Sequence, residues 1–146
     1  MSAASNYLEN EVLDHVLGKG TRDFSSPTNL KLALFSGAAS DVLIALESGQ
    51  SAWSQYEITG NAYARQDVTF DEAIGGSATT ASDVTFPAAT GNYDNTAGSG
   101  STVTCIAVVD GTADECLFYG QLDNSKEILN GDTFQVSAGN LTISLA

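Results

Sequence analysis

The sequence has 146 residues, and its 18 acidic and five basic side chains give a formal net charge of −13 at pH 7. This length is typical of one domain, and a chain of this size buries about 70% of its unfolded surface. The charge argues against nucleic acid as a partner, because phosphate binding needs clustered Lys and Arg. With no run of 18 apolar residues we expect no membrane partner, and the N-terminus does not read as a signal peptide.

Residues 5–17 predict a helix, because their apolar side chains recur at the 3.6-residue spacing of one helical face. The residues on this face are Leu8, Val12, Leu13, Val16 and Leu17. Asn6 followed by Glu9 resembles a capping box, and the glycines at 18 and 20 indicate the end of the helix. The next stretch, 22–28, reads as a loop.

The middle of the chain gives less uniform signals. Alternating apolar residues at 29–36 predict a strand. The apolar run at 41–49 fits a short helix or a strand, and periodicity alone does not separate the two. Residues 50–61 read as a loop with two candidate docking aromatics, Trp53 and Tyr56.

The stretch 62–70 predicts a further strand, in which Tyr63, Arg65 and Asp67 share one face. A Gly-rich turn is expected at 72–80.

Short strands separated by turns are expected over the rest of the chain. The expected strands are 82–90, 102–110, 116–122 and 139–146. In the first of these, Val84 and Phe86 point inward, whereas 91–101 is rich in Gly, Asn and Ser and reads as the most flexible loop. Asn130–Gly131 is a strong hairpin signal.

One N-terminal helix and seven or eight short strands predict a mainly β fold. We expect an antiparallel β-sandwich or a jelly-roll-like barrel, formed by a single domain over 1–146. The N-terminal helical arm, 1–20, either covers one end of the sandwich or projects and docks on a neighbour.

The sequence contains no set of residues typical of an active site. His15 is the only histidine, and together with Cys105 and Cys116 it does not make a triad or a zinc site. We expect the two cysteines to be buried thiols. Carboxylate pairs such as Asp71–Glu72 fall in expected turns or on the helix surface. We therefore expect no catalytic residue, metal site or cofactor, and an enzyme is the least favoured class.

Arg65 stands out because no other basic residue lies between Lys31 and Lys126. One interpretation is structural, in which the guanidinium pairs with a cross-strand carboxylate or with loop carbonyls, Asp67 being on the same face. The other is a contact with another subunit, since Arg is favoured at interfaces. The candidate protein-interface residues are Trp53, Tyr56, Tyr63 and Arg65.

Three stretches contain recognisable strings: GNAYARQDVTF at 60–70, SDVTFPAATGNY at 82–93, and LFYGQLDNSKEILNGDTFQVSAGNLTISL at 117–145. Together with the N-terminal helix and LKLALFSG at 30–37, they resemble a family of small tailed-phage virion proteins. The residue before Tyr63 departs from the Gly or Ser usual in that family. The resemblance omits 38–56, which we expect to be specific to this chain and a candidate for partner contact.

The resemblance implies a structural role in a virion. We favour a capsid cement or decoration protein that binds the outside of the major capsid protein shell and stabilises the head, where many modest contacts add avidity. The alternative is a tail fibre or adhesion component that contacts the host surface, with Trp53, Tyr56, Tyr63 and Tyr93 as candidates for sugar stacking. The expected partners are the major capsid protein and further copies of the chain in a homo-oligomer.

Overall fold

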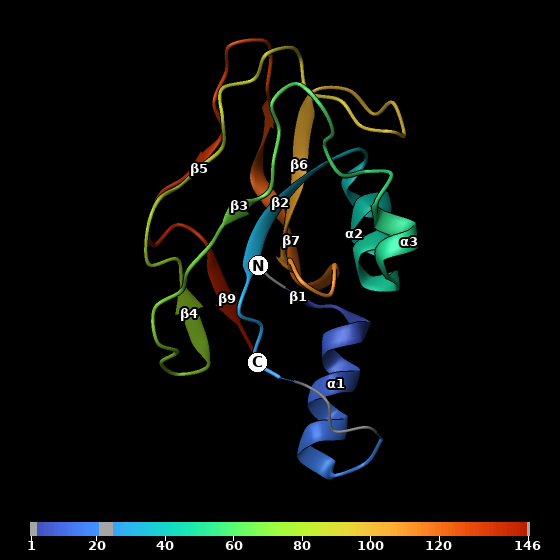
Figure 1. Ribbon diagram of the computed structural model, residues 1–146, viewed down its shortest axis with the longest axis vertical. Helices are drawn as coiled ribbons and strands as arrows, with labels where there is room; N and C mark the ends of the chain where they lie inside the picture. Colours follow the sequence, from blue (N-terminus) through green and yellow to red (C-terminus); the bar gives the residue numbers. More distant parts are fainter. Residues whose placement is uncertain (1–2, 21–24, 146) are drawn as a thin grey trace.

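A five-stranded antiparallel sheet lies at the centre of the computed structural model, which describes residues 3–20 and 25–145 (Figure 1). Its strand order is β1-β7-β6-β2-β3. The bounds are Ala3–Ala4 for β1, Leu30–Ser36 for β2, Gln66–Asp67 for β3, Thr102–Asp110 for β6 and Glu115–Glu127 for β7. Two small antiparallel sheets pair β4 (Ser77–Thr79) with β9 (Thr142–Ser144), and β5 (Val84–Thr85) with β8 (Gln135–Val136).

This arrangement confirms the expected mainly β, antiparallel fold with an N-terminal helix. The central sheet is not closed into a barrel, because its edge strands β1 and β3 do not pair with each other. The small sheets lie toward one face of the central sheet, and two helices lie toward the other (Figure 1).

The described residues form three helices, α1 (Asn6–Leu17), α2 (Ala39–Ser48) and α3 (Gln50–Trp53). The first confirms the predicted N-terminal helix. The second shows that the ambiguous run at 41–49 is helical, and α3 replaces the first part of the loop expected at 50–61. None of the helices within the described ranges is long and apolar enough to cross a membrane.

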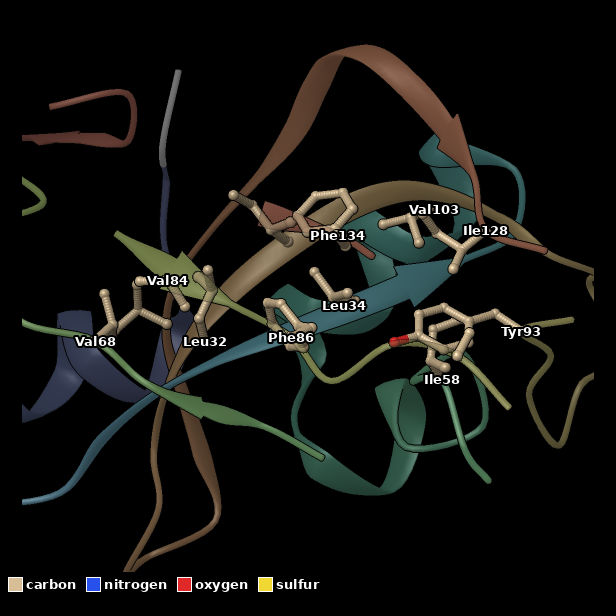
Figure 2. Close-up of a cluster of buried hydrophobic side chains, with 13 residues drawn as sticks. Leu32, Leu34, Ile58, Val68, Val84, Phe86, Tyr93, Val103, Ile128 and Phe134 are labelled. Atoms are coloured by element: carbon tan, nitrogen blue, oxygen red, sulfur yellow. The ribbon is translucent and has the colours of Figure 1, made fainter. Parts of the chain in front are cut away.

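The central sheet is buried on both faces because β2 and β6 are apolar at successive positions, and successive side chains point to opposite sides. One face packs against the small sheets and the loops before them, and its core includes Leu32, Leu34, Val103, Phe86, Tyr93 and Phe134 (Figure 2). The other face packs against α2 and α3, and its core includes Ala33, Phe35, Val109, Val42, Leu46 and Trp53. The predicted inward orientation of Val84 and Phe86 is confirmed.

Helix α1 is attached to the sheet at its N-terminal end. Ser5, and not the expected Asn6, is the N-cap residue: its Oγ accepts a hydrogen bond of 3.3 Å from Leu8 N and donates to the carbonyl of Cys116 on β7. Gly18 ends the helix in the left-handed region at φ 68°. The C-terminal end of α1 projects away from the sheet (Figure 1).

The strand predicted at 62–70 is wrong over most of its length, since only Gln66–Asp67 enters the sheet, opposite β2. The chain turns just before it: Asn61 and Ala62 have positive φ values of 51° and 67°. Such a turn breaks the strict alternation of side chains. Tyr63 therefore packs against the core that Figure 2 shows, whereas Arg65 reaches toward Trp53 in the other core.

Several other boundaries differ from those expected. β7 runs on to Glu127, and the region 72–80 contains β4 as well as a turn. The turn at Asn130–Gly131 is present, with Gly131 at φ 91°, but no hairpin forms, because the chain beyond it pairs with β5 and not with β7. Part of the loop expected at 22–28, and the last residue of the strand expected at 139–146, lie outside the described residues.

The loop at 91–101, expected to be the most flexible, is held by several hydrogen bonds, and three of them come from one buried side chain. Asn95 Nδ2 donates hydrogen bonds of 2.8 Å to the carbonyls of Ser36 and Tyr56, and its Oδ1 accepts one of 3.0 Å from Ser99 N. The loop is therefore fastened to the end of β2 without forming a strand.

Candidate functional site

Arg65 lies at the centre of a cluster of polar side chains. Its Nε and Nη2 donate to the two carboxylate oxygens of Glu57 at 2.6 and 2.7 Å, and its Nη1 donates to Asp114 Oδ1 at 2.6 Å. The guanidinium carbon lies 5.4 Å from the centre of the Trp53 ring, within the range of a cation–π contact. The hydrogen bonds that Arg65 donates to Glu57 and to Asp114 raise the pKa of Arg65 against the opposing effect of burial.

Tyr63 extends this arginine cluster (Glu57, Tyr63, Arg65 and Asp114) into the protein interior. Its hydroxyl donates to Glu57 Oε1 at 3.0 Å and accepts a 3.1 Å bond from the backbone N–H of Leu34. Burial, and next the charge of Glu57, raise the pKa of Tyr63 well above its ordinary value. The Tyr63 hydroxyl and all three guanidinium nitrogens of Arg65 thus have hydrogen-bond partners inside the chain.

The pairing that the sequence suggested for Arg65 is present, but with other acceptors. Asp67 instead binds Lys31, whose Nζ lies 2.5 Å from Asp67 Oδ1 at the surface. Sequence reasoning missed Glu57 and Asp114, and no local signal identified them, because they lie 8 and 49 residues from Arg65. A left-handed φ of 57° at Asp114 places its carboxylate in the β6–β7 turn.

The four candidate interface residues lie in one region of the molecule. Tyr63 and Arg65 contact Glu57 directly, and Tyr56 precedes it in the chain. Trp53 is fully buried beneath the guanidinium, so its ring supports Arg65 from inside. Tyr93 is also buried, and neither ring offers a face on which a sugar could stack. Contact of this region with another chain stays a prediction.

A second surface, the apolar groove, lies between α1, the β4–β9 sheet and the edge of the central sheet. It is a cavity of ≈ 660 Å³. Its lining includes Leu8, Val12, Leu13, Phe70, Phe118 and Leu145, and Glu9 is its only charged residue among those described. An open apolar groove of this size is typical of a protein–protein contact or a ligand site.

The groove continues onto the exposed side of α1. Only Leu8 of the five apolar helix residues is buried, and exposure rises from 39% at Val12 to 72% at Val16. We call Val12, Leu13, Val16 and Leu17 the α1 stripe. Of the two alternatives for this arm, the structure shows a helix that projects, and residues 3–20 and 25–145 leave most of its apolar face uncovered.

The remaining chemistry-bearing residues are dispersed. His15 is exposed on α1, and Asp71 and Glu72 are exposed in a turn. Cys105 and Cys116 are buried and free, and burial raises the pKa of Cys116 to about 12. Within the described part of the chain, no three His, Cys, Asp or Glu side chains converge as metal ligands would.

The described residues thus form an open, mainly β body with an exposed apolar helix face. A family model described as podophage GP4 fiber I protein gp80 matches residues 3–144, so the chain belongs to this family of phage structural fibre proteins. This confirms the resemblance to small phage virion proteins that the sequence motifs suggested. No curated protein matches the chain.

Proposed function

We propose that the protein is a non-enzymatic structural subunit of a phage fibre, and that it binds other virion proteins through the apolar groove and the α1 stripe. The observation that carries this proposal is the uncovered apolar surface on a domain whose two cores are otherwise well buried. Monomeric soluble proteins rarely leave such a surface open to water.

The fibre location is supported by the description of the matching family, which names a fibre protein. A capsid cement or decoration role, in which the chain binds the major capsid protein from outside the head, is the second candidate. Its support is the strong negative charge and the absence of any fibrous repeat in the sequence. A role in contacting a host glycan has less support, because Trp53 and Tyr93 are buried.

A reconstruction of the assembled virion tests the proposal directly. The expected result is density for this fold at the fibre, with the apolar groove and the α1 stripe covered by protein. Copies arranged with icosahedral symmetry on the outer shell would overturn the fibre location in favour of the cement role. Absence of the protein from purified virions would overturn both.

If the role of the protein is structural, the arginine cluster should contribute to folding stability and not to catalysis. Replacing Arg65 or Glu57 should lower folding stability, while virions assembled with folded variant protein should contain it in normal copy number. Loss of any enzymatic activity of the virion on replacement of these residues would contradict the non-enzymatic proposal.

A further inference from the structure

We propose that the Asn130–Gly131 pair is a site of spontaneous covalent modification, and that the folded turn around it suppresses the reaction until the turn opens. The reaction is deamidation, which converts Asn130 to aspartate or isoaspartate. The pair lies in the turn at 129–132, which follows β7 and precedes β8. The inference does not depend on the role of the protein in the virion.

The sequence gives Asn130 the neighbour that this reaction needs. Asn130 is the only asparagine of the chain that precedes a glycine, and it is exposed to water. Because glycine has no Cβ, the backbone nitrogen of Gly131 is the least hindered kind, and the torsions beside it are the freest. In the unfolded chain we therefore expect deamidation to be fastest at this pair.

The reaction is a ring closure within the chain. Gly131 N loses its proton and attacks Cγ of Asn130. The new C–N bond forms as the bond from Cγ to the side-chain nitrogen breaks, and that nitrogen leaves with the proton as ammonia. Water then opens the cyclic imide at either carbonyl, which gives aspartate or isoaspartate. Nothing is oxidised or reduced, and water is the only co-reactant.

The geometry of the 129–132 turn opposes this ring closure. Asp132 N donates to the Leu129 carbonyl at 3.0 Å, and Asp132 Oδ2 accepts a bond of 2.9 Å from Leu129 N. Gly131 has φ 91°, whereas Asn130 has a negative φ, and this combination is a type II turn. Its second residue has ψ near about 120°, so that the nitrogen of Gly131 points away from Cβ of Asn130. The chain must rotate about the Asn130 Cα–C bond before this nitrogen reaches Cγ.

Two further hydrogen bonds hold the reacting pair in that conformation. Gly131 N donates to the carbonyl of Ala89 at 2.7 Å, and Asn130 N donates to Asn92 Oδ1 at 3.0 Å. The attacking nitrogen is thus itself a donor in the folded protein, and its peptide plane cannot rotate without breaking this bond. The rate of deamidation should therefore follow the fraction of molecules in which the turn is open.

The products do not fit the turn. Isoaspartate lengthens the main chain by one carbon atom between residues 130 and 131, so the hydrogen bonds on the two sides of the pair lose their spacing. Either product also adds a carboxylate two residues from Asp132, in a chain whose net charge is already −13. We expect the turn to stay open once the modification has occurred.

Peptide mass spectrometry on the full chain, aged at mildly alkaline pH, tests the site and its protection. Conversion of Asn130 should be at least about 30-fold slower in the folded protein than in the same chain unfolded in urea. In urea, Asn130 should react faster than every other asparagine. Equal rates with and without urea would overturn the protection, and faster conversion of another asparagine in urea would overturn the site.

Asn92→Ala tests the hydrogen bonds of the turn. It removes the acceptor of Asn130 N and should accelerate conversion roughly 3- to 10-fold. Asn124→Ala is the matched control and should leave the rate unchanged, because Asn124 is also exposed and lies on β7, outside the turn. Circular dichroism shows whether both variants are folded, and the comparison with urea needs no variant. A folded Asn92→Ala protein that reacts no faster than the control would overturn the proposed protection by these bonds.

Discussion

Arg65 joins three segments that are far apart in the sequence. Its guanidinium connects the residues after α3, through Glu57, to the β6–β7 turn, through Asp114, and covers the Trp53 ring. The planar fork of arginine matches a carboxylate with two parallel hydrogen bonds, which lysine does not do. One of the few basic side chains of this protein thus lies where several hydrogen-bond acceptors converge.

Replacing Arg65 should destabilise the protein strongly. Arg65→Met leaves Glu57, whose side chain is only 11% exposed, without its cation, and we expect a loss of about 3 kcal/mol in the free energy of unfolding. Urea titration measures this. The double variant Arg65→Met/Glu57→Gln should be more stable than Arg65→Met, because it removes the uncompensated charge.

The control for this series is Lys31→Met. It breaks the ion pair with Asp67, which is 81% exposed, and should cost less than about 1 kcal/mol. Equal losses for Arg65→Met and Lys31→Met would show that the arginine cluster is no stronger than a surface pair.

The buried thiol of Cys116 makes the free energy of unfolding depend on pH in the alkaline range. Its pKa is raised from 9.0 to about 12 by burial and by the charge of Glu115, so the folded protein holds the thiol proton more tightly than the unfolded chain. The stabilising contribution is therefore fully present below pH 9 and is lost as the pH rises toward 12. The free energy of unfolding of Cys116→Ala should decline less steeply over this window than that of the wild type. Parallel curves for the two proteins would contradict the assignment.

Among the elements, β2, β6 and α1 were predictable because each has a clear pattern of apolar residues along its length. β2 and β6 lie inside the sheet, where both faces need apolar residues, and α1 repeats apolar residues at helical spacing. The run at 41–49 fits either period, and only its position over the sheet makes it a helix. The pairing of β4 with β9 joins residues about half the chain apart, and no local pattern encodes such a contact.

The candidate site was predictable only in part, for a related reason. Arg65 was identifiable because basic residues are rare in this sequence, whereas its partners depend on a turn at Asn61–Ala62 that the strand pattern concealed. The α1 stripe was visible as a periodic apolar face. Whether that face would be covered depended on the position of the helix at the edge of the sheet, which the sequence left open.

In the loop at 91–101, the side chain of Asn95 makes three of the hydrogen bonds that order an irregular element. Asn95→Ala removes the donor to two backbone carbonyls and the acceptor for Ser99 N, and we expect a loss of about 2 kcal/mol in stability. Amide hydrogen exchange should become faster within 91–101. Asn124→Ala, at an exposed position of β7, should change stability by less than about 0.5 kcal/mol. Unchanged exchange in Asn95→Ala would show that other contacts hold the loop.

At the scale of the whole molecule, the net charge of −13 opposes association of two copies. Two such charges with centres about 35 Å apart repel by roughly 20 kcal/mol in unscreened water. A Debye length of about 8 Å at 0.15 M salt removes most of this repulsion, whereas a length of about 30 Å at 0.01 M leaves much of it.

Any self-association of the chain should therefore strengthen with salt. Sedimentation equilibrium should show more association at about 0.15 M than at roughly 0.01 M sodium chloride. Association that weakens over this range would mean that attractive ion pairs between copies outweigh the repulsion of the net charge.

Both thiols of the chain lie under the α2 side of the central sheet, where a water-soluble reagent does not reach them while the protein is folded. A cysteine introduced at a solvent-facing position would then be the sole reactive sulfur. A variant with one such added cysteine could be labelled there with a maleimide dye or a gold cluster, and its two native cysteines would not need to be removed. The label would then locate the protein in intact particles by light or electron microscopy.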